Sequence, residues 1–155
     1  MGRSSRRSSS RSVNSRVIEE LAKFRYGIRQ FLRFSENAAR DSGVTPQQHQ
    51  LMLGVAGFTC RGSANISELA EFLQERHNAV VELVNRASRA GLVRREISAS
   101  DRRVVRVELT PRGRAILARL SALHRDEMER IRDGRRANLF PRVAKASGPQ
   151  NRDRR

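Results

Sequence analysis

The sequence predicts a mainly α-helical fold that carries one small β-hairpin, and three observations support this prediction. Apolar residues recur at helical spacing in several segments between residues 17 and 132. Two short helical runs within residues 66–90 are separated by a break of about three residues. Alternating apolar and charged residues within 92–109 indicate paired strands. The 155 residues have the length of one domain.

The first predicted helix covers about residues 17–40. Its apolar residues repeat at alternating four- and three-residue spacing, and neighbouring apolar residues widen this stripe: Val17, Leu21, Phe24, Ile28 and Phe31, widened by Ile18, Leu32 and Phe34. One neighbouring helix cannot cover so wide an apolar surface. We therefore expect this helix to pack against a second copy of the chain in a homodimer.

The second predicted helix runs from Pro46 to about Phe58. Thr45 stands at the N-cap, Pro46 at the first helical position and Gln48 at the third. This order is typical of a capping box that is followed by proline. The apolar residues of the segment share one face of the helix: Leu51, Val55 and Phe58.

Residues 66–90 predict two short helices with a tight turn between them. Asn65 and Glu68 resemble a capping box at the start of the first helix. The turn is Gln74–Arg76, and Gly91 ends the second helix. The two apolar stripes that face the core have helical spacing: Ile66, Leu69, Ala70 and Leu73 in the first, then Val80, Leu83, Val84 and Ala87. Two short helices joined in this way suit a protein that reads the major groove of DNA.

Residues 92–109 predict a hairpin, with strands at Leu92–Ile97 and Arg103–Leu109. The segment Ser98–Asp101 between them is rich in turn-forming residues. After the hairpin, Thr110 and Pro111 repeat the pattern of a cap followed by proline. The helix that starts there is expected to reach about Arg132, and Ala137–Phe140 is a candidate for a short final helix that Pro141 limits. Residues 111–141 are longer than the small hairpin module can cover, so they are assigned to the dimer interface.

Positive charge is unevenly distributed along the chain, whose formal net charge is +16. Residues 1–16 hold five arginines and no acidic residue, and residues 134–155 hold seven basic residues and one acidic residue. We expect a disordered basic arm over 1–16 and a basic tail over 142–155. Residues 76–114 also hold ten arginines and four acidic residues. Charge gathered on one module is typical of a phosphate-binding face.

The segment from Ile66 to Arg114 resembles the MarR family of winged helix-turn-helix transcription regulators. The motifs that carry this resemblance are Ser67–Ala70, Leu83–Arg86, Ala90–Val93, Asp101–Arg103 and Leu109–Gly113. The resemblance implies one domain over residues 17–141, with a helix-turn-helix at 66–90, a wing at 92–109 and dimerisation helices at about 17–40 and 111–141. The turn departs from the family pattern, because Gln74–Arg76 replaces the small, apolar and hydroxyl residues usually found there.

The outward face of the second short helix supplies the first group of candidate DNA-binding residues. On a helical wheel, Asn78 and Glu82 lie opposite the apolar stripe, and Val81 and Arg86 flank them. Asn78 pairs with adenine, Glu82 accepts from cytosine, Val81 meets a thymine methyl group and Arg86 reaches guanine or phosphate in this interpretation. His77 stands at the start of the helix. The alternative for each is a solvated helix face.

The tip of the hairpin supplies the second group. Arg102 and Arg103 are adjacent on an extended chain, so they point to opposite sides. The resemblance assigns Arg103 to the minor groove, which leaves Arg102 to contact phosphate or to remain solvated. Asp101 is assigned to hold the wing through a charge-assisted hydrogen bond to Arg112 or to another basic residue near the next helix. The alternative is an ordinary exposed turn.

No catalytic or metal-binding motif stands out. His49, His77 and His124 fall on three different predicted helices without the spacing of a helical metal site, so we expect no metal, no cofactor and no enzymatic activity. We expect His49 to pack beside the second helix and His124 to be solvated or at the dimer interface. Cys60 is the only cysteine, and we interpret it as a small structural residue; a reactive thiolate beside Arg61 is the alternative.

The chain contains neither a membrane-spanning run nor a secretory signal, so we expect a cytoplasmic protein. The sequence favours a homodimeric repressor that binds double-stranded DNA at a pseudo-palindromic operator. Two alternatives remain open: an architectural DNA-binding protein of low sequence specificity, and a winged-helix module for protein contacts. The resemblance implies a small aromatic effector, and Phe24, Arg25, Tyr26 or Phe58 are candidates to line its site; core packing explains these aromatic residues equally well.

Overall fold

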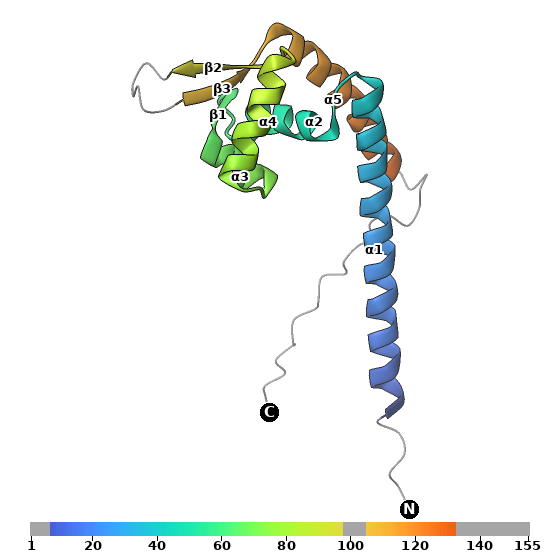
Figure 1. The fold of residues 1–155 in the computed structure, drawn as a ribbon. Helices are drawn as coiled ribbons and strands as arrows, with labels where there is room; N and C mark the ends of the chain where they lie inside the picture. The colour runs from blue at the N-terminus through green and yellow to red at the C-terminus, as the bar shows by residue number, and fades with distance from the viewer. Residues whose placement is uncertain (1–6, 98–104, 133–155) are drawn as a thin grey trace, which may run out of the picture. The chain divides into compact units, whose positions relative to one another are not determined.

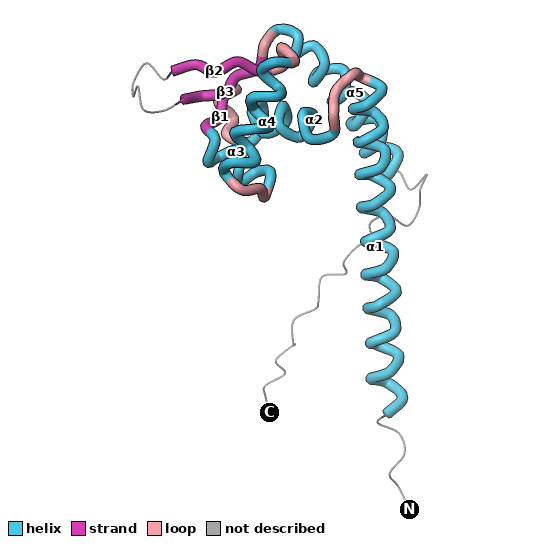
Figure 2. Tube along the Cα trace, viewed as in Figure 1, coloured by secondary structure: helices cyan, strands magenta, loops and turns pink. Residues whose placement is uncertain are grey.

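The computed structural model describes residues 7–97 and 105–132 (Figures 1 and 2). Its helices are α1 (Arg7–Asp41), α2 (Pro46–Leu53), α3 (Ile66–Leu73), α4 (His77–Arg89) and α5 (Pro111–Arg132), with a π-helical turn, η1, at Gly54–Phe58. Its strands are β1 (Ser63–Asn65), β2 (Val93–Ile97) and β3 (Val105–Leu109). The chain divides into two compact units, residues 31–129 and the remainder, and the core lies in the first.

Helix α1 begins at Arg7, so the predicted start near residue 17 was too late. Between Arg7 and Arg16 the only apolar residue is Val13, which is why periodicity gave no signal there. Adding a residue to an existing helix costs far less than nucleating one, and arginine is a good helix former. The ion pair from Arg16 to Glu20, with 3.4 Å between Nε and Oε1, joins neighbouring turns at this boundary.

The predicted capping boxes are confirmed at α2 and α3. Gln48 N–H donates to Thr45 Oγ1 at 3.1 Å, and Thr45 N–H donates to Gln48 Oε1 at 2.9 Å. Asn65 and Glu68 exchange the same pair of bonds at 2.8 and 2.9 Å. Side chains thus satisfy backbone donors that lack partners in the first helical turn. The helical segment from Pro46 to Phe58 is also confirmed, although its last turn has π geometry.

Helices α3 and α4 form the predicted helix-turn-helix. Gln74 ends α3 in the left-handed region, at φ 54°, and lets the chain turn within three residues. The four stripe residues of α4 are all buried: Val80, Leu83, Val84 and Ala87. Gly91 follows α4 with φ 68°, a conformation that favours glycine, so the predicted end of this helix is confirmed.

The wing belongs to a three-stranded antiparallel sheet of order β1-β3-β2, where the sequence predicted only two strands. Strand β1 pairs with β3 from Ser63 opposite Glu108 to Asn65 opposite Arg106. The hairpin pairs Val93 with Leu109 and Ile97 with Val105. With only three residues, β1 is too short to show an alternating pattern, so the sequence could not reveal it. This strand places α3 beside the wing.

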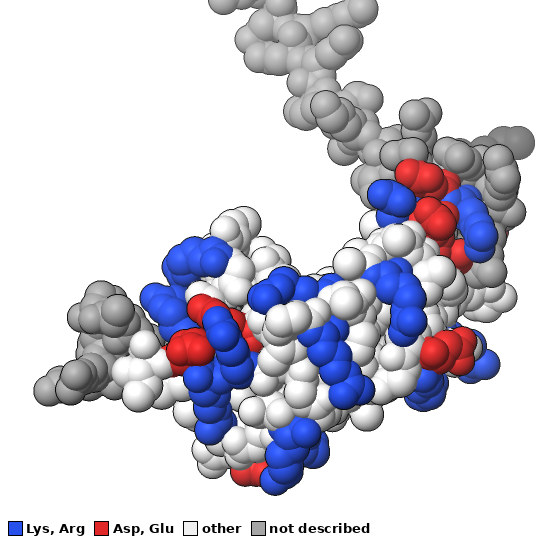
Figure 3. All heavy atoms as spheres, turned by 90° about the horizontal axis from the view of Figure 1, so that it is seen from above, with Lys and Arg blue, Asp and Glu red and all other residues white. Residues whose placement is uncertain are grey.

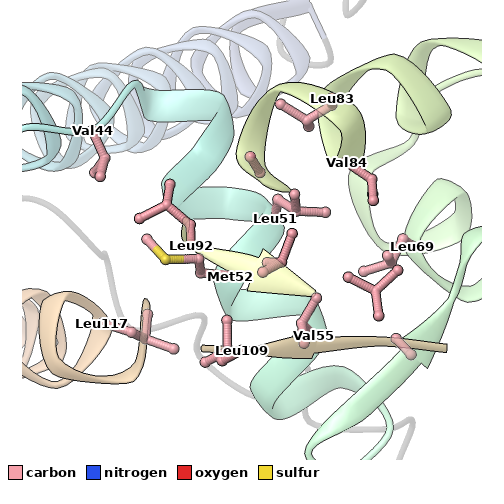
Figure 4. Packing of buried hydrophobic residues seen from close by; sticks show 14 of the residues in the cluster. Val44, Leu51, Met52, Val55, Leu69, Leu83, Val84, Leu92, Leu109 and Leu117 are labelled. Carbon is pink, nitrogen blue, oxygen red and sulfur yellow. The ribbon is translucent and has the colours of Figure 1, made fainter. Parts of the chain in front are cut away.

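The apolar core of residues 31–129 joins the sheet to the helices around it. Figure 4 shows Leu51, Met52 and Val55 pointing into the same space as side chains from α4 and the wing strands. Leu117 and Leu120 attach α5 to this core. A packed core of this kind holds the outward face of α4 in a defined direction, because its inward face is buried.

His49 and His124 form a buried contact that the sequence did not predict. Their ring centroids lie 4.9 Å apart. His124 Nδ1 donates to the carbonyl of Leu120 at 2.7 Å, so in the neutral ring Nε2 accepts from the Ser35 hydroxyl, 2.8 Å away. His49, which was expected to pack beside the second helix, lies within that helix, α2, and is buried. His124 is half-buried and packs within its own subunit against two rings of α1, Phe31 and Phe34, so it is not the fully solvated residue that was one of the two expectations; a place at the dimer interface stays a prediction.

Candidate nucleic-acid interface

The outward face of α4 presents the predicted residues together. His77, Asn78, Glu82 and Arg86 are exposed, and Val81 is half-buried. This arrangement follows from the packing of the opposite stripe, which fixes the rotation of the helix about its axis. Asn85, also half-buried, donates through Nδ2 to Glu82 Oε1 at 3.4 Å. The face therefore combines hydrogen-bond donors, an acceptor, a cation and a small apolar group.

The base of the wing carries a charged cluster on the face opposite the core. Arg94 Nη2 lies 3.0 Å from Glu108 Oε2 on the neighbouring strand, and its Nε lies 3.3 Å from Glu96 Oε1. The hydrogen bond to Glu108, followed by the charge of Glu96, raises the pKa of the Arg94 guanidinium. Acidic and basic side chains lie side by side at the sheet, next to the grey wing loop in Figure 3. This arginine therefore cross-links the strands.

Asp101, Arg102 and Arg103 lie outside the described residues, so their assigned roles stay predictions. Arg112 is exposed in the first turn of α5. Its neighbour Arg114 has the anchoring position: Nη1 of Arg114 donates to the carbonyl of Leu109, at the end of β3, at 2.7 Å. Sequence reasoning missed Arg114. The helix dipole disfavours a positive charge near the start of a helix. The position of Arg114 in the sequence could therefore have indicated that its side chain has a specific partner.

Thr110 joins the end of α4, the start of β2 and the start of α5. Its hydroxyl donates to Gly91 O at 2.6 Å and accepts from Gly113 N–H at 3.0 Å, while its own N–H donates to Leu92 O at 3.1 Å. Gly113 permits this junction, since an added Cβ would lie 2.1 Å from the Leu92 carbonyl oxygen. These bonds hold the end of α4 and the start of the wing to the start of α5.

The remaining candidate residues do not form a second chemical centre. Within residues 7–97 and 105–132, no group of three potential ligands could hold a metal ion. Cys60 is exposed at φ 55°, with Sγ 3.7 Å from Gly57 O. None of the described helices has both the length and the hydropathy of a membrane span.

Comparisons with known proteins agree with this geometry. The model of the MarR family matches residues 42–104, from the loop before α2 to the wing. The HTH-type transcriptional repressor MdtR of Bacillus subtilis (strain 168) is 34% identical over 98 residues. The match covers 56% of this chain and 61% of that repressor.

Solved structures share the fold. A MarR family transcription regulator has a TM-score of 0.69 at 23% identity, over 79% of this chain and 80% of the other. A mutant of MarR from E. coli, complexed with operator DNA, has a TM-score of 0.58 at 20% identity, over 75% of this chain and 81% of the other. Together with the family model matched over residues 42–104, these likenesses show that the chain has the fold of the MarR family of winged helix-turn-helix transcription regulators and is similar to that family.

Proposed function

We propose that this protein is a ligand-responsive repressor that binds a pseudo-palindromic operator as a homodimer. The observation that carries the proposal is the outward face of α4, whose mixed groups can distinguish base edges. A binder that relied only on charge would favour arginine and lysine there, whereas this face includes Asn78, Val81 and Glu82. The operator-bound structure of the E. coli relative supports the same use of the fold.

Helix α1 supports the dimer. Within the unit that contains the first part of α1, Val17, Ile18 and Leu21 are 46, 59 and 57% exposed. Apolar residues at this density on a helix face need a partner surface, and a second copy of α1 supplies one of the same chemistry. Sedimentation should therefore give about twice the chain mass at low micromolar concentration. A monomer that still binds an operator tightly would exclude the dimer.

In this proposal each subunit places α4 in a major groove and its wing along the adjacent minor groove. Asn78, Val81, Glu82 and Arg86 face base edges or nearby phosphates, and His77 lies at the entry of the helix. Arg103 enters the minor groove and Arg102 contacts phosphate. Asp101 holds the wing, with Arg112 or Arg114 as its partner near the start of α5.

Selection from random DNA tests sequence reading. A palindrome with half-sites about one helical turn apart should emerge, and it should bind at least about 10³-fold more tightly than random duplex at physiological salt. Equal affinity for all duplexes would favour the architectural alternative, because a net charge of +16 attracts DNA of any sequence. Absence of DNA binding would favour the protein-interaction module.

A further inference from the structure

Helix α4 carries a single carboxylate, Glu82, which is exposed on the face that points away from the core. The next two residues, Leu83 and Val84, are buried and fix the rotation of the helix at this point (Figure 4). Phosphates repel a carboxylate, so Glu82 lowers the attraction of this face for DNA in general. Its presence on such a face indicates a specific contact.

The cation nearest to Glu82 in the sequence does not neutralise it. Arg86 lies one turn further along the same face, at a spacing that favours an ion pair on a helix. Among residues 7–97 and 105–132, however, neither Glu82 nor Arg86 takes part in an ion pair. The carboxylate and the guanidinium both stay available to an external partner.

Asn85 holds the carboxylate instead. Its Nδ2 donates to Glu82 Oε1 at 3.4 Å, and Asn85 is half-buried whereas Glu82 is exposed. A hydrogen bond of this length adds little stability, but it restricts a long side chain that otherwise samples many rotamers. Glu82 Oε2 has no hydrogen-bond partner in the described part of the chain. One carboxylate oxygen is therefore held and the other is open.

The chemistry of the base edges selects what the open oxygen can bind. An ionised carboxylate only accepts hydrogen bonds. In the major groove cytosine presents its N4 amino group, whereas guanine and thymine present acceptors that repel a carboxylate. Adenine presents its N6 amino group beside the N7 acceptor, so a carboxylate there gains one bond and meets one repulsion. Cytosine fits the open oxygen of Glu82 best.

We propose that Asn85 positions the Glu82 carboxylate, and that the pair makes each operator half-site depend on the N4 amino group of one cytosine. The inference rests on the function proposed above, in which Glu82 faces base edges, and adds the positioning role of Asn85, which the sequence did not assign. The pair acts by exclusion as well as by attraction, because an uncompensated carboxylate weakens binding wherever that cytosine is missing.

Operator duplexes with N4-methylcytosine test the pair, because the methyl group replaces the amino hydrogen in the major groove and leaves base pairing intact. Selection from random DNA with the full-length protein supplies the operator, and each cytosine of one half-site is then methylated in turn. Fluorescence anisotropy measures the ratio of the affinities for the unmethylated and the methylated duplex. At one position this ratio should be about ten for the parent protein.

Three variants separate reading from positioning. Glu82→Ala removes the acceptor and should bring the ratio close to one. Asn85→Ala should lower the ratio about threefold, because the freed carboxylate loses rotamer freedom only when it binds the cytosine. Ser88→Ala is the matched control, since Ser88 is an exposed polar residue of α4 that makes no hydrogen bond with Glu82, and it should keep the parent ratio. A loss of folded protein affects both duplexes equally and cancels in the ratio.

Three results would overturn the inference: no cytosine at which N4 methylation matters, a ratio that Glu82→Ala leaves unchanged, or equal ratios for Asn85→Ala and the parent protein. Selection with Glu82→Gln gives a second check. Glutamine accepts from N6 and donates to N7 of adenine, so adenine should replace the cytosine, and a retained cytosine would contradict the inference. An operator bound without sensitivity to N4 methylation would contradict this inference alone, whereas a protein that selects no operator would contradict the proposed function as well.

Discussion

At the scale of single residues, the absence of a side chain at Gly113 allows the start of α5 to approach the start of β2 closely. Its Cα lies against the Leu92 carbonyl, where an added Cβ would be 2.1 Å from the oxygen. Neither partner is a flexible side-chain end, so the start of α5 or the start of β2 must move. The Thr110 bonds to Gly91 and Gly113 depend on the same approach.

Replacement of Gly113 by alanine should therefore lower the free energy of unfolding by about 1–3 kcal/mol, as other overpacking substitutions do. Urea denaturation followed by circular dichroism measures the loss. Gly57→Ala is the control: it is also a helical glycine, but nothing lies within 4 Å of its added Cβ. It should leave the unfolding midpoint almost unchanged, and a similar midpoint for both variants would show that the close approach does not constrain the fold.

His49 gives the second prediction at this scale. Burial, and then the charge of His124, lowers the pKa of His49 from 6.5 to about 4. The folded protein thus favours the neutral ring, while the unfolded chain takes up a proton near pH 6.5. The resulting stability is fully present above pH 6.5 and is lost as the pH falls towards 4, with a slope of at most about 1.4 kcal/mol per pH unit.

Urea denaturation between pH 7.5 and 4.5 measures that slope. His49→Gln should reduce it, and His77→Gln should not, because His77 is exposed on α4. The comparison is made within each variant, so a general loss of stability in His49→Gln does not obscure the result. An unchanged slope in that variant would assign the acid sensitivity to other groups.

At the scale of elements, the sequence alone predicted those features that depend on residues close to one another in the chain. Capping boxes and the stripe of α4 depend on residues three or four apart, so they predicted the starts of α2 and α3 and the rotation of α4. Strand β1 and the contact between His49 and His124 depend on partners far along the chain. Each histidine lies alone on its helix, and no spacing rule could have joined them.

The candidate site divides in the same way. The exposed residues of α4 were predicted because one buried stripe determines the opposite face. The anchoring contact of Arg114 was not predicted, because it forms where separate elements meet, between α5 and the end of β3. The assignments at the wing tip stay predictions.

The wing tip can be tested as an element. Arg103→Ala should weaken operator binding by about 1–3 kcal/mol without unfolding the dimer, because alanine cannot reach into the minor groove. Asp101→Ala should also weaken binding although it removes a negative charge, since the wing loses its hydrogen bond. Arg125→Ala, on the exposed side of α5, removes the same charge away from the wing. Anisotropy at fixed salt would reject the assignment if Arg103→Ala bound normally or Asp101→Ala bound more tightly.

At the scale of the whole molecule, the sequence places positive charge both on the module that we propose reads bases and on the basic segments at residues 1–16 and 134–155. The five arginines of residues 1–16 precede the apolar stripe that starts at Val17. Deletion of these residues removes charge and leaves the stripe and the core intact. Phosphate contacts release counterions and make affinity depend on salt, whereas base contacts determine which sequence is preferred.

Deletion of residues 1–16 should therefore flatten the dependence of operator affinity on salt concentration but keep the preference for the operator over random duplex. Every phosphate that the shortened chain no longer neutralises should reduce the slope of log affinity against log salt by about 0.9. A full-length variant with glutamine in place of the five arginines is the control for chain length and for the first turns of α1. Anisotropy from 50 to 300 mM salt measures both quantities. If preference fell together with the slope, the N-terminal arginines would take part in sequence reading, because electrostatic attraction alone changes the affinity for operator and random DNA by the same factor.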